Sequence, residues 1–337
     1  MRVSKLTAPR KIELFEEPMT REPGIGEACV KVKAVGICGT DLHIFLGERS
    51  DVELPRVMGH ELSGIVEKVG EGVANIKPGD HVVFDPVVAC GTCKTCRSGH
   101  PNVCADVKCF GVQMDGGFQD YIIADAGKLY RYPEEIPFEE AALAEPFSVA
   151  ANILTKTAAT REDRIVIIGA GTIGLAILQA AKGIGAAVLI SDVEDKKLKA
   201  AEEFGADVTV NSKTQDLAEK VMAFAPGGAD ILIDAVGAAP LTEQTVDLAA
   251  PEARIAVIGF DGRPMQIPPV KITKKELTLI GSRMNNGMFP KVIEWLEEGC
   301  LNTAGMVTRV YPVEEIQRAF TDTLANSDSN VKTVIRF

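Results

Sequence analysis

The hydrophobic and polar positions follow two different patterns along the chain. Up to about residue 145, apolar runs of strand length are interrupted by Gly, Pro and Asp, as in ACVKVKAVGIC and ELSGIVEKVGEGV. This pattern predicts an irregular all-β domain, a barrel, over residues 1–147. From Arg164 onward, β-branched runs such as RIVIIG and DILIDAVG alternate with amphipathic stretches such as TIGLAILQAAKGIG. That alternation predicts a doubly wound parallel sheet covered by helices over residues 148–285.

The alternation ends after about Gly281. Two helical stretches, FPKVIEWLEEG and VEEIQRAFTDTLAN, then precede a last apolar strand, VKTVIRF. Residues 286–337 are therefore predicted to form a separate C-terminal segment. A length of 337 residues suits two domains. We expect an α/β protein with one β-barrel domain and one parallel-sheet domain.

The net charge of the chain disfavours some classes of binding partner. The chain has 36 Lys and Arg against 47 Asp and Glu, a net charge of −11, which disfavours general binding to nucleic acid or to anionic membranes. The N-terminal stretch MRVSKLTAPRKIELFEE carries charge every few residues, unlike a secretory signal. The longest uncharged run, Ile165–Ala181, is short for a membrane span and contains three glycines. We expect a cytoplasmic protein with a small-molecule substrate and with neither nucleic acid nor membrane as a partner.

A glycine-rich turn, GAGTIG (residues 169–174), follows directly on the apolar strand RIVII and opens a helix. Gly169 permits a tight turn, Gly171 lets the backbone approach a pyrophosphate, and Gly174 lets the helix pack closely on the strand. The positive end of the helix then faces the phosphates. The arrangement predicts a dinucleotide site; a purely structural glycine turn is the alternative.

The next strand ends at Asp192, eighteen residues after Gly174. A carboxylate at this place accepts hydrogen bonds from the adenosine ribose and repels a 2′-phosphate, and no Arg follows among the next three residues. The sequence therefore favours NAD over NADP. The residues expected at the cofactor are Gly169, Gly171, Thr172, Ile173, Gly174, Asp192, Val236, Gly237 and Gly259.

Four of the eight cysteines fall within fifteen residues, as Cys90-x-x-Cys93-x-x-Cys96-x7-Cys104. Four thiolates close a tetrahedral zinc site and leave no position for substrate, which is typical of a structural zinc. An iron–sulfur cluster and a nucleic-acid zinc ribbon are the alternatives. The acidity of the chain and the lack of interleaved aromatic residues count against the ribbon.

A second set of potential ligands is dispersed: Cys38 in GICGTDLH, His60 and Glu61 in GHELSG, and Glu145 in AEPF. Thiolate, imidazole and carboxylate together suit zinc. His60 and Glu61 point apart in a regular strand, so both reach one metal only across a bend. Taken singly, Cys38 is also compatible with a small core residue and Glu145 with a surface carboxylate. Spacing alone does not assemble these four.

The segment Gly59-His-Glu-x-x-Gly64-x5-Gly70-x-x-Val73 resembles the signature of the zinc-containing medium-chain alcohol dehydrogenase superfamily. The resemblance extends over the Cys38-x-Thr40-x-x-His43 segment, the four-cysteine lobe, the GAGTIG turn and the last strand. It implies a GroES-like catalytic domain (1–147) with a zinc lobe at 85–110, a Rossmann domain (148–285) and a C-terminal segment (286–337) that returns to the catalytic domain. It also implies two zinc ions per chain, one structural and one catalytic, and a homo-oligomer, a dimer or a tetramer.

Within this superfamily, Glu145-Pro146 resembles the sorbitol, threonine and sugar-acid dehydrogenases. This likeness implies that Cys38, His60 and Glu145 surround the catalytic zinc, with Glu61 as a ligand or a near neighbour. Stretches such as DPVVACGTC, GVQMDGGFQDY and SRMNNGMFPKVIEWL are most similar to the bacterial group that oxidises hexonates, such as L-gulonate or L-galactonate, and that includes the starvation-sensing protein.

The implied reaction moves a hydride from a secondary hydroxyl of a sugar acid to NAD and gives a keto acid. Zinc acidifies the hydroxyl, and the resemblance implies that Thr40 and His43 relay its proton; a structural His43 is the alternative. We expect Arg283 to bind the substrate carboxylate and Asn285 to bind a sugar hydroxyl. A structural ion pair or a contact with the cofactor is an equally good interpretation of Arg283. The competing functions are dehydrogenation of a neutral polyol, a polyol phosphate or L-threonine, and NAD sensing without turnover.

Overall fold

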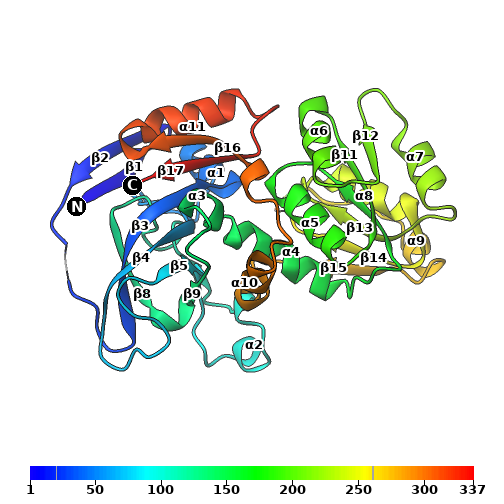
Figure 1. Ribbon diagram of the computed structural model, residues 1–337. Helices are drawn as coiled ribbons and strands as arrows, with labels where there is room; N and C mark the ends of the chain where they lie inside the picture. Colours follow the sequence, from blue (N-terminus) through cyan, green and yellow to red (C-terminus); the bar gives the residue numbers. More distant parts are fainter. Residues whose placement is uncertain (20, 260–261) are drawn as a thin grey trace. The chain divides into compact units, whose positions relative to one another are not determined.

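The computed structural model describes residues 1–19, 21–259 and 262–337, which form two compact units (Figure 1). Unit 1 consists of Met1–Ser148 together with Asn285–Phe337, and unit 2 of Val149–Met284. Each boundary lies one residue from the boundary expected from the sequence pattern. The C-terminal segment is thus part of the β-rich unit, and unit 2 is an insertion into it along the chain.

Unit 1 is built on a seven-stranded sheet of order β16-β17-β3-β4-β5-β9, with β8 paired to β3. Its strands are β3 (Glu27–Ile37), β4 (Glu61–Val69), β5 (His81–Phe84), β8 (Tyr121–Asp125), β9 (Leu129–Arg131), β16 (Val307–Pro312) and β17 (Lys332–Arg336). Two smaller sheets pair β1 (Arg2–Ala8) with β2 (Lys11–Glu16) and β6 (Val87–Val88) with β7 (Lys108–Cys109). The last strand, β17, pairs antiparallel with β3 and parallel with β16, so it lies between these two strands in the sheet.

Five helices lie wholly within the described part of unit 1. They are α1 (Gly39–Leu46), α2 (Lys94–Arg97), which belongs to the four-cysteine lobe, α3 (Phe138–Ala141), α10 (Phe289–Glu297) and α11 (Ile316–Ala325). In α11 the buried residues Ile316, Ala319, Phe320 and Thr323 recur at the three- and four-residue spacing of one helix face. The Phe320 ring lies 5.1 Å from that of Phe45, so the C-terminal helix packs on the core of the N-terminal segment.

Unit 2 is a six-stranded, fully parallel sheet of order β12-β11-β10-β13-β14-β15. Its strands are β10 (Arg164–Ile168), β11 (Ala187–Asp192), β12 (Val208–Asn211), β13 (Ala229–Asp234), β14 (Ala249–Val257) and β15 (Thr278–Gly281). The helices between them are α5 (Thr172–Gly183), α6 (Asp195–Glu203), α7 (Leu217–Phe224), α8 (Ala239–Leu248) and α9 (Pro269–Thr273). The doubly wound sheet predicted from the sequence is confirmed, and the strand order reverses between β10 and β13.

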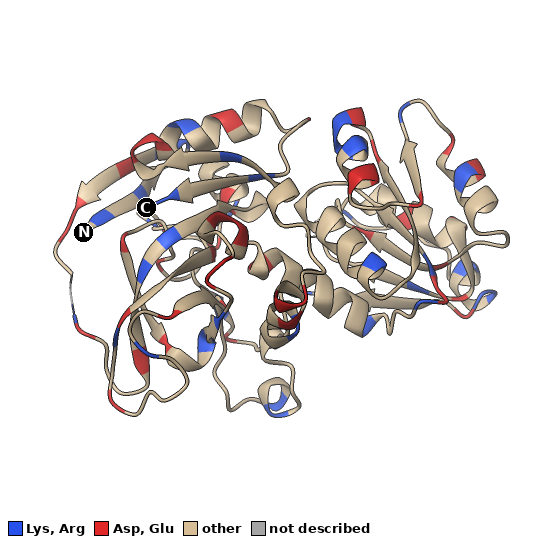
Figure 2. Ribbon diagram, in the orientation of Figure 1, with Lys and Arg blue, Asp and Glu red and all other residues tan. Residues whose placement is uncertain are grey.

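The apolar runs of unit 2 that the sequence predicts to be strands are buried on both faces, as is typical of parallel strands between two layers of helices. In β10, Ile165–Ile168 are all buried. Charged residues of both signs are interspersed along α6, whose sequence is DKKLKAAEE (Figure 2). Helix α4 (Ala144–Lys156) begins in unit 1 and ends in unit 2. Within the described residues, none of the helices combines the length and the apolar character needed to cross a membrane.

Strand β10 and helix α5 approach each other at two glycines. A Cβ on Gly174 would lie 1.8 Å from the carbonyl oxygen of Gly169, far inside van der Waals contact. Gly169 itself has a φ of 102°, a conformation that favours glycine. The tight strand-to-helix turn therefore depends on both residues.

The Gly174→Ala substitution should lower the free energy of unfolding by about 1–3 kcal/mol, because the new methyl group forces α5 away from β10. Gly183→Ala is the matched control in the same helix, since a Cβ there meets no atom within 4 Å; it should be neutral or stabilise by up to about 1 kcal/mol. Urea unfolding of both variants checks the pair, and equal midpoints would contradict the packing argument.

Candidate active site

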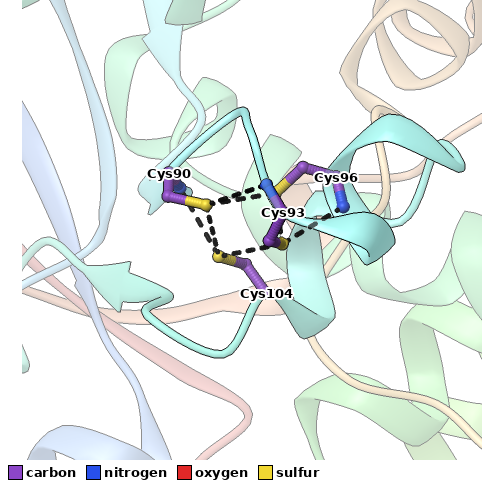
Figure 3. A group of neighbouring side chains, drawn as sticks. All are labelled: Cys90, Cys93, Cys96 and Cys104. Carbon is purple, nitrogen blue, oxygen red and sulfur yellow. Dashed lines mark hydrogen bonds between the residues drawn. The ribbon is translucent and has the colours of Figure 1, made fainter.

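The four cysteines of the lobe after β6 converge on one point (Figure 3). The Sγ atoms of Cys93 and Cys96 are 3.4 Å apart, those of Cys90 and Cys104 3.4 Å, those of Cys93 and Cys104 3.8 Å, and those of Cys90 and Cys96 4.0 Å. A tetrahedron of Zn–S bonds of about 2.3 Å has edges of about 3.8 Å. The lobe thus fits a closed four-thiolate zinc site, as the sequence predicts.

The backbone of the lobe also favours thiolates. The amides of Cys93, Cys96 and Cys90 point at the Sγ atoms of Cys90, Cys93 and Cys104, at 3.4–3.5 Å. Hydrogen bonds from Thr95 and the Cys96 amide lower the pKa of Cys93 to about 5. Because the thiolate is the form that binds metal, the loop is prepared for a cation by its own amides.

The dispersed ligands come together in unit 1. Cys38 lies between β3 and α1, and His60 directly precedes β4, which begins at Glu61. One potential ligand atom from each of the three lies within 4.8 Å of those of the others. The bend that adjacent ligands need is present, because Gly59 has a φ of 91° and His60 is outside the regular strand. Glu145, at the start of α4, is buried but not part of this three-residue cluster.

Asp41 is a site residue that the sequence analysis did not identify. Its side chain is fully buried and accepts hydrogen bonds from the amides of Cys38 (2.9 Å) and Gly59 (3.2 Å). Its Oδ1 is 3.7 Å from Nδ1 of His60. Asp41 therefore ties together the two backbone segments that carry the ligands. Its place three residues after Cys38, at a helix N-terminus, was the available signal.

The electrostatics of this cluster fit a bound cation. Burial, with the neighbouring Glu61 charge, raises the pKa of Glu145 to about 7. Burial alone would lower the pKa of His60, but the Asp41 and Cys38 charges raise it well above its usual value. Within the described part of the chain, buried Nδ1 of His60 has no hydrogen-bond partner. A divalent cation would relieve the excess of negative charge, so the donor set fits zinc.

Lys332 is the second residue that the sequence analysis missed. It enters from β17, is 2% exposed, and its Nζ lies 2.7 and 2.6 Å from the two carboxylate oxygens of Glu61. Burial alone would lower the pKa of Lys332, but the charge of Glu61 raises it. A signal existed, since Lys332 shares a strand face with the buried Val334. Nothing in the sequence paired it with a residue 271 positions earlier.

The predicted proton relay residues both lie in α1. Thr40 is half-buried in its first turn, and His43 is exposed. Nδ1 of His43 is 2.6 Å from Oε2 of Glu48, just beyond the end of the helix. The carboxylate favours the tautomer that carries the proton on Nδ1, which leaves Nε2 as the acceptor.

The predicted cofactor residues gather at the carboxyl ends of the strands of unit 2. Gly171 caps α5 without a side-chain hydrogen bond, and a Cβ there would meet no atom within 4 Å. Asp192 accepts from the amides of Ala170 (2.7 Å), Val193 (2.7 Å) and Glu194 (3.0 Å). The turn thus leaves open space at Gly171 and holds the Asp192 carboxylate against the amide of Ala170, which suits a dinucleotide.

The remaining cofactor residues lie at the ends of the next two strands. Val236 and Gly237 follow β13, and Gly259 follows β14. A Cβ on Gly259 would lie 1.9 Å from the Cα of Gly237, so the two loops touch backbone to backbone. Val236 is 57% exposed at the carboxyl end of β13.

The predicted substrate residues lie in different units: Arg283 is half-buried in unit 2, and Asn285 is 2% exposed in unit 1. Nδ2 of Asn285 donates to Asp85 (3.1 Å), and its Oδ1 accepts from the amide of Gly287 (3.2 Å). Both ends of the Asn285 side-chain amide thus form hydrogen bonds within the protein. We therefore do not carry Asn285 into the substrate site proposed below.

Both units of the chain match known protein families. The family model for the alcohol dehydrogenase GroES-like domain matches residues 24–134, and the model for zinc-binding dehydrogenase matches residues 172–298. The starvation-sensing protein RspB of Escherichia coli K12 is 37% identical over 315 residues, 92% of each chain. L-galactonate-5-dehydrogenase of the same strain is 31% identical over 317 residues, 94% of this chain and 93% of the relative.

Among solved structures, that of rspB from Escherichia coli CFT073, complexed with NADH, has a TM-score of 0.95 at 35% identity. It covers 100% of this chain and 99% of the other. The likeness therefore extends over both units and includes the metal-binding and glycine-rich segments described above.

Loss of one thiolate should empty one metal site and leave the other. Cys104→Ser, in a buried position of the lobe, should reduce the zinc retained after dialysis from about two ions per chain to about one. Cys300→Ser is the matched control, because Cys300 is exposed and outside both ligand clusters. Elemental analysis measures both variants, and a lobe that keeps its zinc without Cys104 would rule out the four-thiolate site.

Proposed function

The chain belongs to the zinc-containing medium-chain alcohol dehydrogenases, an oxidoreductase family that uses zinc and a nicotinamide dinucleotide, and from this premise we propose that it oxidises a secondary hydroxyl of a sugar acid with NAD. The observation that carries the proposal is the convergence of Cys38, His60 and Glu61 in unit 1, which also contains the buried Glu145. Such a set belongs to a catalytic rather than a structural metal, because the four-thiolate lobe already supplies the closed site.

We assign Cys38, His60, Glu61 and Glu145 to the catalytic zinc and Cys90, Cys93, Cys96 and Cys104 to the structural zinc. When bound, the catalytic zinc supplies Lewis acidity, which makes a substrate hydroxyl more acidic. The chain orients this centre through Asp41, which joins the Cys38 and Gly59 backbones and faces His60. The hydride acceptor binds in unit 2 at the GAGTIG turn.

The hydroxyl proton has to leave the site. Thr40 and His43 lie on one short helix, and Nε2 of His43 is the free acceptor because Glu48 engages Nδ1. Since His43 is exposed, it exchanges protons directly with water. We propose that these residues carry the proton from the cofactor ribose to solvent.

Two observations support a sugar acid as the substrate: the similarity to a named relative and the presence of the Arg283 guanidinium. L-galactonate-5-dehydrogenase, a relative at 31% identity, is named for a hexonate. Arg283, next to the end of unit 2, supplies a guanidinium that matches a carboxylate with two hydrogen bonds. A neutral polyol, a polyol phosphate or L-threonine is the alternative substrate. The homo-oligomer and the cytoplasmic location expected from the sequence stay predictions.

The first experiment measures NADH formation by the zinc-loaded protein with hexonates, the matching neutral polyols and threonine. We expect turnover of a hexonate that is lost when its carboxylate is replaced by a hydroxymethyl group. Arg283→Met should lower kcat/KM for the hexonate by about 100-fold, the cost of two hydrogen bonds to a charged group. Arg161→Met, at an exposed arginine of the same unit, is the control. Faster turnover of a polyol or of threonine would exclude the sugar-acid assignment.

Asp192 should decide the choice of cofactor. Asp192→Ala should weaken NAD binding by about 10–100-fold, because hydrogen bonds from the ribose to a charged group are lost. NADP should bind as well as before or better, since the repulsion of its 2′-phosphate disappears, and retained NADP binding also shows that the fold is intact. Glu203→Ala removes the same charge from an exposed site in α6 and is the control. Fluorescence titration gives both affinities; unchanged NAD affinity would refute the role of Asp192.

A further inference from the structure

Asp234, the last residue of β13, is a buried carboxylate to which the proposed function gives no role. Its side chain is 0% exposed. In the sheet of unit 2 it pairs with Ile168 of β10 on one side and with Val257 of β14 on the other. Asp234 therefore lies at the carboxyl edge of the sheet, beside the place where the strand order reverses, and open α/β sheets bind their ligands there.

Three hydrogen bonds hold this carboxylate. Its Oδ1 accepts from the amides of Val236 (3.0 Å) and Gly237 (2.8 Å), and its Oδ2 accepts from the hydroxyl of Thr242 (2.7 Å) in α8. A charged acceptor buried away from water needs such donors, so the carboxylate and its donors fix one another. Asp234 thus ties the loop at residues 235–238 to the first turns of α8.

That loop borders the glycine-rich turn. A Cβ built on Gly169 would lie 2.7 Å from Cγ2 of Val236, so the valine side chain lies against the first glycine of GAGTIG. A Cβ on Gly237 would lie 2.3 Å from the Cα of Gly259, so the loop also touches the backbone that follows β14. Because both contacts are already close, a displaced loop changes the shape of the space beside the turn.

The position of Val236 needs a restraint. Its side chain is 57% exposed, and removing apolar surface from water is favourable, so an unrestrained loop favours conformations that cover this side chain. The hydrogen bonds from the Val236 and Gly237 amides to Asp234 oppose such a change. The carboxylate therefore selects one loop conformation among several.

We propose that Asp234 is a positioning residue of the dinucleotide site, which holds Val236 and Gly237 in the arrangement that NAD requires. This inference rests on the cofactor site of the proposed function and not on the identity of the substrate. The apparent affinity for a ligand falls with the fraction of molecules that are in the binding arrangement. Bound NAD selects that arrangement, so loss of Asp234 should weaken cofactor binding and leave turnover at saturation nearly unchanged.

The test titrates the full-length, zinc-loaded protein with NADH and follows the fluorescence of the nicotinamide. Asp234→Ala should weaken NADH binding by about tenfold or more, as expected when about a tenth of the loops or fewer are in the binding arrangement. Asp230→Ala is the matched control and should bind NADH like the wild-type protein. Asp230 lies in the same strand and accepts the amide of Arg164 (2.8 Å), but at the amino end of the strand.

Two threonines of α8 separate positioning from a structural role. Thr242 and Thr245 are both buried, and the Thr245 hydroxyl donates to the carbonyl of Thr242 (2.6 Å) within the helix. Replacement of either by Val removes one buried hydroxyl at nearly constant volume, so both variants should lose stability to urea. Thr242→Val alone removes a donor from Asp234, and it should weaken NADH binding by about threefold or more while Thr245→Val leaves the affinity unchanged.

Asp234→Asn keeps an oxygen for the two amides and should retain the NADH affinity within about threefold. With a hexonate as substrate, Asp234→Ala should raise KM for NAD by about tenfold and change kcat by less than about twofold. A folded Asp234→Ala protein with wild-type NADH affinity would overturn the proposal. Equal weakening of NADH binding by Thr242→Val and Thr245→Val would also overturn it.

If Asp234→Ala does not fold, the two threonine variants decide the question in its place. A wild-type protein that does not bind NADH would remove the dinucleotide site and this inference with it. Failure of the hexonate assay alone would leave the NADH titrations, and the role of Asp234, intact.

Discussion

The structure of unit 1 depends on holding several negative charges in an apolar interior. Asp41, Glu61 and Glu145 are all buried, and Glu61 shares a potential metal site with Cys38 and His60. Left alone, such groups protonate or destabilise the fold, because desolvation of a charge costs several kcal/mol. Three compensations are visible: backbone amides for Asp41, an ammonium for Glu61, and a donor set around His60 and Glu145 that fits a divalent cation.

This constraint explains features that otherwise look unrelated. Gly59 adopts a left-handed conformation that turns His60 toward the cluster, and Gly36 leaves space for a carboxylate within a central strand. The C-terminal strand pairs with β3 and carries the lysine that contacts the Glu61 carboxylate. In the four-cysteine lobe, backbone amides directed at the sulfur atoms likewise stabilise negative charge.

Those parts of the fold and of the candidate sites that depend on residues close together in the chain could be predicted from the sequence. The GAGTIG turn lies between a strand and a helix in consecutive residues, and the four cysteines fall in one loop, so their spacing alone predicts a site. The strands of unit 2 are apolar on both faces and the pattern shows it directly. For Cys38, His60 and Glu145, only the resemblance to a family joined residues far apart in the chain.

What the sequence did not reveal depends on contacts between distant segments. Lys332 is a common residue type in a short strand, and its partner is set by strand order, which periodicity does not encode. Asn285 was expected to face a sugar because amides often bind hydroxyls, but in the structure its amide is engaged by Asp85 and the backbone of Gly287. Polar residues have many possible partners, and only the tertiary arrangement selects one.

The separation of Glu61 from Lys332 along the chain sets an order of events during synthesis. The ribosome delivers the lysine 271 residues after the glutamate, an interval of roughly 14–54 s at translation rates of about 5–20 residues per second. Unit 2 is continuous in sequence and can fold within that interval, whereas unit 1 still lacks the strand that balances its buried carboxylate. Maturation of the catalytic centre is therefore one of the last steps in the formation of each molecule, after the nucleotide-binding half is already in place.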